Sequence, residues 1–244
     1  SVDADVSASL DGYARGDGPV ELPAGVSPLE LQRQLRRSAS RWIGPGNAAD
    51  AARRRLAVGT FALELIDTNF ETAWHWQRGF ALPRMVRKAG GVVQTCCLKT
   101  HRYGGHFTLS LKNSVGLAAK NIPGNAHDFM RELHSSPHQR QMIAEINAAY
   151  RPELIVLDGV AAFVSGGPDH GQRVDAGVVL AATDRVALDA VGVALLRHFG
   201  TTPEVSRGAI FEQEQIARAV QLGLGVTGPG QIELVTGDRE SAVF

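Results

Sequence analysis

Residues 90–113 read GGVVQTCCLKTHRYGGHFTLSLKN, and this stretch indicates the fold class most directly. Its first nine residues, 90–98, form a largely apolar run, which is typical of a strand covered on both faces in an α/β protein. The run predicts that Lys99, Thr100 and His101 follow just beyond the carboxyl end of this strand. Open α/β sheets bind ligands in the crevice at that end, so we expect a ligand site there.

Lysine is rare in this chain, and it clusters in the same stretch. The chain has 4 lysines against 21 arginines, and Lys99, Lys112 and Lys120 fall within 22 residues. An ammonium group is a compact point charge whose pKa shifts on burial, whereas a guanidinium group is a planar fork that stays charged. The alternative is three surface lysines that happen to cluster. We favour an anion pocket, because the stretch also supplies other suitable groups: His101, His106, Tyr103, Gly104, Gly105 and Asn113.

Composition excludes several classes of partner. The formal net charge is +0, from 25 basic and 25 acidic residues, which argues against a nucleic-acid partner. No apolar run approaches the roughly 20 residues that span a bilayer, and no signal segment opens the sequence. We therefore expect no membrane partner and a cytoplasmic location. The preference for arginine over lysine suggests a bacterium with a GC-rich genome. Nothing in the sequence specifies an oligomeric state. Cys96 and Cys97 are predicted to be reduced core residues.

The pattern along the chain predicts a leader and one domain. Residues 1–58 are expected to form an irregular leader and two helices that pack on the core. Residues 59–244 are expected to form a single α/β domain, with a mostly parallel or mixed sheet and helices on both faces. Further elements are expected in this domain: strands at 61–67, 154–159, 176–184 and 231–237, helices at 185–200 and 209–223, a helical region at 126–149 broken near Pro137, and an arm at 69–83. Residues 107–117 suit a strand or the start of a helix, and we favour the helix.

Three aspartates are further candidates for the ligand site. Asp158 is expected at the carboxyl end of strand 154–159, and Asp184 at the start of the helix that follows strand 176–184. Asp184 could equally be a helix cap, since free N–H groups favour a carboxylate there. Asp189 has apolar neighbours on its helix and is predicted to be buried. A buried carboxylate must be paired, hydrogen-bonded or protonated, and the scarce lysines are its natural partners.

Two weaker patterns concern an anion and a metal. Gly166 and Gly167 lie in an expected glycine-rich loop, residues 163–175, which could cradle an anion but more simply turns the chain. Three histidines of the 126–149 region, spaced by seven and four residues, could lie on one face of a helix: His127, His134 and His138. A divalent metal could bind there, or on Asp158 and Asp184 with a histidine. No metal or other cofactor is predicted, because no complete ligand set stands out. His75, between two tryptophans, is expected to be structural.

Together these residues suggest acid–base chemistry on a small organic anion. A desolvated lysine, or a histidine beside a carboxylate, can exchange protons near neutral pH. We assign catalytic roles to Lys99, His101, Lys112 and Asp158. We assign substrate binding to Thr100, Tyr103, Asn113, Gly166, Gly167, Asp184 and Asp189. No G-x-S-x-G elbow, Walker loop or G-x-G-x-x-G motif is present.

The order of these motifs resembles the domain-of-unknown-function family 362 over roughly residues 80–237. The family's K-T-H motif matches residues 99–101, its S-L-K-N motif residues 110–113, its D-G motif residues 158–159, and its D-P-V-A-V-D-A segment residues 184–190. The family's opening K-P-N motif has no match here, Ser165 replaces a common acidic residue, and Arg185 replaces a common proline. Many relatives carry ferredoxin-type cysteine clusters or export signals.

Two functions follow as expectations. The first is an isomerase- or lyase-like enzyme of specialised metabolism, acting on a carboxylate, phosphate or enolisable carbonyl compound. The second is a non-catalytic or redox-accessory metabolite-binding protein, which the family's ferredoxin attachments imply.

Overall fold

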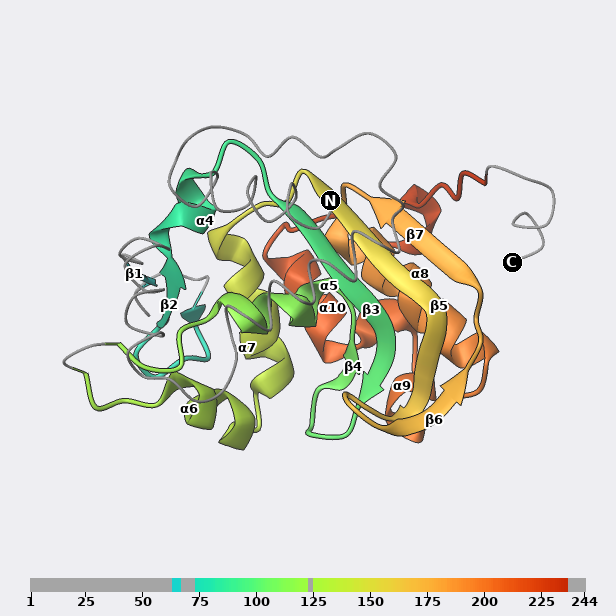
Figure 1. Cartoon of the computed structure of the whole chain (residues 1–244), viewed down its shortest axis with the longest axis horizontal. Coiled ribbons are helices and arrows are strands. Elements are labelled where there is room, and N and C mark those ends of the chain that lie inside the picture. The colour runs from blue at the N-terminus through green and yellow to red at the C-terminus, as the bar shows by residue number, and fades with distance from the viewer. Residues whose placement is uncertain (1–62, 67–72, 123–124, 237–244) are drawn as a thin grey trace, which may run out of the picture. The chain divides into compact units, whose positions relative to one another are not determined.

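The computed structural model describes residues 63–66, 73–122 and 125–236 (Figure 1). All of these belong to one unit of the chain, which begins at Ala62. The expected leader and helices of residues 1–58 lie outside the described residues. Among the described residues, no helix has both the length and the apolar character required to cross a bilayer.

The larger sheet has five strands and is mixed. Its two central strands, β3 (Val93–His101) and β5 (Leu154–Gly166), run parallel. β4 (His106–Thr108) pairs antiparallel with β3. β6 (Gly171–Val174) and β7 (Val178–Ala182) both pair antiparallel with β5. The α/β class and the mixed sheet expected from the sequence are confirmed.

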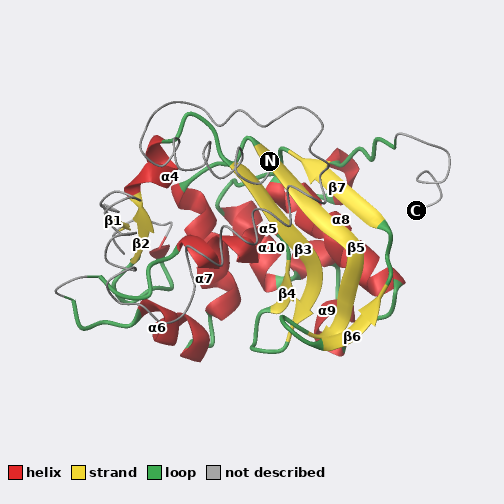
Figure 2. Cartoon of the chain, viewed as in Figure 1, coloured by secondary structure: helices red, strands yellow, loops and turns green. Residues whose placement is uncertain are grey.

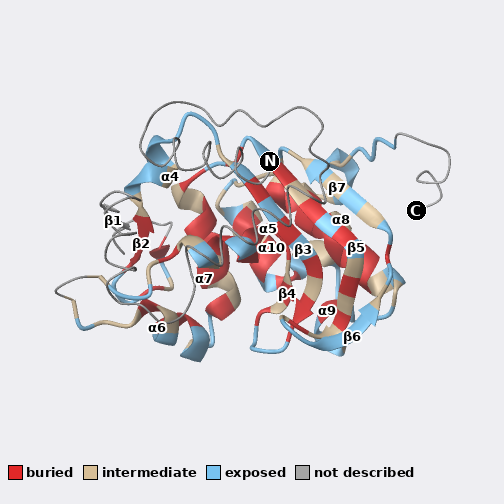
Figure 3. Cartoon of the chain, viewed as in Figure 1, coloured by how far each residue is buried: buried red, intermediate tan, exposed pale blue. Residues whose placement is uncertain are grey.

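β3 buries one face and exposes the other. Cys96 and Leu98 are buried, whereas Val93 and Cys97 are exposed, and Figure 3 shows this alternation along β3 and β5. In the described part of the chain, β3 is thus covered on one face, whereas the apolar run suggested both. Cys97 was predicted to be a core residue, but its side chain is exposed. Gln94, a polar residue within this run, lies on the buried face, where its side-chain amide donates to Ser110 O at 2.6 Å.

β5 is a long strand that continues well past Asp158 (Figure 2). Its first half pairs with β3 and β7, and its second half with β6. The register against β3 shifts after Cys97, so that Lys99 lies opposite Phe163. Residues 160–164, VAAFV, keep an apolar pattern that suits a strand, and the strand continues here because β6 pairs with it. The expected glycine-rich loop is therefore a hairpin, with its turn between Gly166 and Gly171.

Helix α8 (Arg185–His198) covers the buried face of the sheet together with the short helix α5 (Ser110–Asn113). A 3-10 turn at Ser114–Leu117 continues α5. Leu98 of β3, Leu157 of β5 and Val193 of α8 share one core cluster. The remaining elements at the carboxyl end are α9 (Pro203–Ser206), α10 (Glu214–Gln221), and 3-10 turns at Ile210–Glu212 and Pro229–Gln231.

A second core cluster joins the helices α6 and α7 to the first described segments. β1 (Leu63–Ile66) pairs antiparallel with β2 (Phe80–Pro83), which runs into α4 (Arg84–Lys88). α6 (Phe129–Ser135) and α7 (Gln139–Ile146) are separated at Pro137 as expected, and a 3-10 turn at Asn147–Ala149 follows. The described part of the expected arm joins this core, which includes Trp76, Phe80, Phe129 and Met142.

The other expected elements are partly correct. Strand 61–67 corresponds to β1. The helix expected at 107–117 begins only at Ser110, because His106–Thr108 pairs with β3 as β4. The helix expected at 209–223 is a 3-10 turn followed by α10. The strand expected at 231–237 is wrong for its described residues: Leu234 and Val235 are exposed, and no strand forms there.

Candidate functional site

Lys99, His101 and Lys112 come together at the carboxyl end of β3. Lys99 and His101 belong to the last three residues of that strand, and Lys112 lies on α5. Lys99 Nζ donates a hydrogen bond to Pro168 O at 3.2 Å. A β-carbon placed on Gly105 would lie 2.3 Å from Lys112 Cε and 3.3 Å from His101 Nδ1. The Lys112 side chain therefore passes through the space that the missing Gly105 side chain leaves, beside the His101 ring.

The site is basic and buried. Lys112 is 7% exposed and His101 9% exposed, and His101 Nδ1 has no hydrogen-bond partner among the described residues. Burial, and then the charge of Lys112, lowers the pKa of His101 to about 4. Burial, and then the charge of Lys99, lowers the pKa of Lys112 to about 8. At neutral pH His101 is therefore uncharged, and Lys112 loses its proton at a lower pH than an ordinary lysine does.

No carboxylate of a described residue forms an ion pair with Lys99 or Lys112. A buried ammonium group without a counter-charge is unfavourable on its own. A negative charge placed beside these ammonium groups would offset that cost.

Asp189 holds α5, and hence Lys112, in place. Its side chain is fully buried, accepts the backbone N–H of Ser110 at 2.7 Å, and accepts that of Leu111 at 3.1 Å. Its burial is as predicted, but its partners are these N–H groups rather than a lysine. Burial raises the pKa of Asp189 to about 7, while the two backbone hydrogen bonds act in the opposite direction. Asp189 is thus a positioning residue for the start of α5.

The Gly166–Gly167–Pro168 turn packs against the end of β3. A β-carbon on Gly167 would lie 2.1 Å from Thr100 O, and Gly167 has a φ of +62°. Arg102 NH1 donates to Gly167 O at 2.8 Å and pairs with Asp169 Oδ1 at 2.8 Å. This turn therefore forms one wall of the site through its backbone.

Thr100, Tyr103 and Asn113 lie near the site, and each has a structural contact. Thr100 Oγ1 donates to Phe163 O at 3.1 Å, and Asn113 Nδ2 donates to Thr95 O at 2.9 Å. The exposed Tyr103 ring contacts His101 edge-on, with a centroid distance of 5.6 Å, and its hydroxyl accepts Arg102 NH2 at 2.6 Å.

A scan against protein families matches the chain to the domain of unknown function DUF362 over residues 51–194, more than half of its length. The chain belongs to the DUF362 family. The K-T-H and S-L-K-N motifs of this DUF362 member are therefore the segments that supply Lys99, His101 and Lys112. No curated protein and no solved structure matches the chain.

In this DUF362 chain, neither Asp158 nor Asp184 forms an ion pair with the three basic residues of the described site. Asp158 is exposed in the middle of β5, where its Oδ1 accepts Val160 N–H at 3.0 Å. It does not end its strand as expected, because β5 continues. Asp184 caps α8 through the N–H groups of Val186 and Ala187, and it also accepts Val226 N–H at 2.8 Å. Since β7 runs antiparallel to β5, Asp184 lies at the opposite end of the sheet from Lys99.

The predicted metal alternatives receive no geometric support. Among the described residues, no group of three or more His, Cys, Asp or Glu side chains is arranged to hold a metal ion. His127 pairs with Glu132, and His134 Nδ1 lies 2.7 Å from Met130 O, so these imidazoles already have local partners.

Sequence reasoning named Gly105 without its packing role, and it missed Arg102 and the structural role of Asp189. The Gly104–Gly105 pair between two histidines was a usable signal, because close approach by another side chain requires glycine. Arg102 directly follows the K-T-H motif, but its contact with the Gly167 turn comes from residues 65 positions away in sequence.

Proposed function

We propose that the Lys99–His101–Lys112 site is the active site of an enzyme that binds a small organic anion and moves a proton on it. The substrate class is a carboxylate, a phosphate ester or an enolisable carbonyl compound, and the reaction is isomerase- or lyase-like. The observation that supports this most is the buried Lys112 side chain, which lies beside Lys99 and uncharged His101 with no carboxylate partner in the described part of the chain.

The three residues have distinct proposed roles. Lys99 keeps an ammonium group at the wall of the site and stabilises the negative oxygen of the anion or enolate. Lys112, as the free amine, removes a proton next to the carbonyl, since its pKa is close enough to neutral for both forms to be present. Uncharged His101 donates or accepts a hydrogen bond at the reacting group. This chemistry uses side chains alone and omits Asp158 and Asp184.

Hydrogen–deuterium exchange tests the proposal without knowledge of the full reaction. The protein is incubated in D₂O with a panel of small carboxylates and phosphate esters that carry a C–H bond next to a carbonyl, and exchange is followed by NMR. We expect exchange in at least one compound, slowed by about 100-fold or more in Lys99→Met and Lys112→Met.

Lys120→Met is the matched control, because Lys120 is an exposed lysine outside the site. It should exchange at the wild-type rate. Exchange that proceeds equally in all three variants would contradict the proposal. A compound that binds through Lys112 and never exchanges would instead support the alternative, a non-catalytic or redox-accessory metabolite-binding protein.

A further inference from the structure

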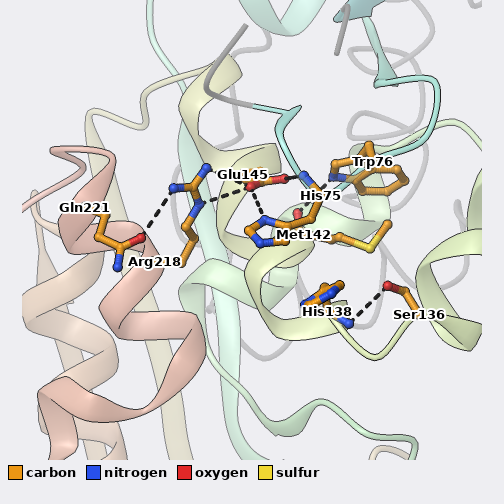
Figure 4. Close-up of polar contacts among 8 residues, drawn as sticks. All are labelled: His75, Trp76, Ser136, His138, Met142, Glu145, Arg218 and Gln221. Carbon is orange, nitrogen blue, oxygen red and sulfur yellow. Dashed lines mark hydrogen bonds and ion pairs between the residues drawn. The ribbon is translucent and has the colours of Figure 1, made fainter. Parts of the chain in front are cut away.

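Glu145 and His75 form a second polar centre, distant in sequence from the K-T-H motif. Glu145 is fully buried and lies between Arg218 and His75 (Figure 4). Its Oε1 accepts Arg218 Nε at 3.0 Å and lies 2.6 Å from His75 Nδ1. Its Oε2 accepts the His75 backbone N–H at 3.1 Å. The sequence suggested a stacked structural histidine, whereas His75 is oriented by a buried carboxylate.

This arrangement orients the His75 ring. Arg218 already balances the charge of Glu145, with a second contact from its NH2 at 2.9 Å. An ionised carboxylate only accepts hydrogen bonds, so His75 Nδ1 carries the hydrogen and donates it to Glu145. Orientation of an imidazole by a buried carboxylate is common where the other ring nitrogen acts on a ligand.

A second imidazole is held in a similar way nearby. His127 Nε2 lies 2.6 Å from Glu132 Oε2, and the other oxygen of Glu132 accepts Gln77 N–H at 2.6 Å. Gln77 follows His75 by two residues, so the two imidazole–carboxylate pairs are joined through one short segment.

Both imidazoles line one cleft of about 460 Å³, a size that suits a small metabolite. Arg131 of α6 also lines this cleft, which we call the His75 cleft. Both carboxylates of this cleft already have partners within the protein. Glu132 contacts His127 and Gln77, and Asp128 accepts the Arg131 N–H as the cap of α6. The Arg131 guanidinium forms no hydrogen bond or ion pair with any described residue. The groups left for a ligand are therefore a guanidinium and two imidazole nitrogens.

We propose that the His75 cleft binds a small molecule through an oxyanion group, a phosphate or a carboxylate. Arg131 binds the oxyanion, for which its planar fork is suited. His75 and His127 each offer one ring nitrogen, which accepts from a ligand hydroxyl when neutral and donates to the oxyanion when protonated. This site is separate from Lys99, His101 and Lys112, so it stands whether or not those residues catalyse a reaction.

Side-chain NMR of ¹⁵N-labelled histidines tests this site directly. Inorganic phosphate and succinate are titrated separately into the full chain at constant ionic strength. We expect a saturable shift of the His75 and His127 signals with at least one of them, and a dissociation constant raised by roughly tenfold in Arg131→Gln. A response to phosphate alone identifies a phosphate site, and a response to both identifies a general oxyanion site.

Two control variants make the test specific. Arg151→Gln removes an exposed arginine outside the cleft and should bind as wild type does. Lys112→Met should also leave the His75 and His127 response unchanged, which separates this site from the proposed active site. Shifts that never saturate with either anion, or that are equally strong in Arg131→Gln, would overturn the proposal.

Discussion

Lys112 is the residue on which the account of the site depends most. It is buried next to another lysine, and its side chain occupies space that exists because residue 105 is glycine. A group that is unfavourable for the folded state and placed beside a predicted ligand site is typical of residues kept for function rather than stability.

Replacement of Lys112 by methionine should therefore stabilise the protein. Met has a similar length and no charge, so Lys112→Met should raise the free energy of unfolding by about 1–3 kcal/mol at pH 7. Chemical denaturation of both proteins measures this difference. A lower stability of Lys112→Met would mean that the ammonium group has a favourable partner.

The pH dependence of this gain has a defined sign. The pKa of Lys112 is about 8 in the folded state and 10.5 in an unperturbed lysine, so the unfolded chain binds more protons between these values. Stability of the wild type relative to Lys112→Met should therefore rise with pH in this window. The advantage of Lys112→Met is largest below pH 8 and disappears above about pH 10.5.

For single residues, the sequence predicted the lysine cluster and the burial of Asp189 but not the hydrogen-bond partners of Asp189. The rarity of lysine identified Lys99 and Lys112, and the apolar neighbours of Asp189 identified its burial. The hydrogen bonds of Asp189 were not predictable, because Ser110 is 79 residues away and its N–H becomes available only when α5 starts there.

Among the elements, the hairpin between β5 and β6 connects the glycine turn to the site. Gly167 has a positive φ, which strains a residue that carries a β-carbon, and a β-carbon there would also clash with the Thr100 carbonyl. Gly177 also has a positive φ, +66°, but a β-carbon placed on it would meet no atom within 4 Å. A comparison of the two glycines therefore separates the cost of a positive φ from the cost of a steric clash.

Gly167→Ala should destabilise the fold by about 3 kcal/mol or more, and Gly177→Ala by only about 1 kcal/mol. The difference arises because only the first substitution forces the hairpin away from β3. Thermal unfolding of the two variants checks this expectation. Equal losses would show that the hairpin moves freely and does not form a fixed wall of the site.

Element prediction succeeded where the pattern was local. The break near Pro137 and the helix from Arg185 follow from residues within each segment. It failed where strands extend by pairing: β5 continues past Asp158 because β6 folds back on it, and β4 forms because β3 offers an edge. These pairings placed Asp158 in the middle of a strand.

Across the described chain, two polar sites lie on different elements. The Lys99 site uses β3, α5 and the hairpin turn, whereas the His75 cleft uses α6, the segments on either side of it, and residues 75–77. Both are lined by residues within the part that matches DUF362. Arg218 of α10, which balances Glu145, lies beyond that part. Only the first site was accessible from sequence motifs, because the second depends on carboxylates far from their histidines.

We propose above that Lys112 is a buried amine that titrates near neutral pH and responds to an anion. Since the chain has 4 lysines, selective ¹³C labelling of lysine Cε gives four NMR signals, and Lys112→Met identifies the one from Lys112. We predict that this signal titrates near pH 8 and shifts to higher pH when a carboxylate or phosphate ester from the exchange panel is bound. A Lys112 signal that titrates near pH 10.5 and ignores every anion would contradict the account.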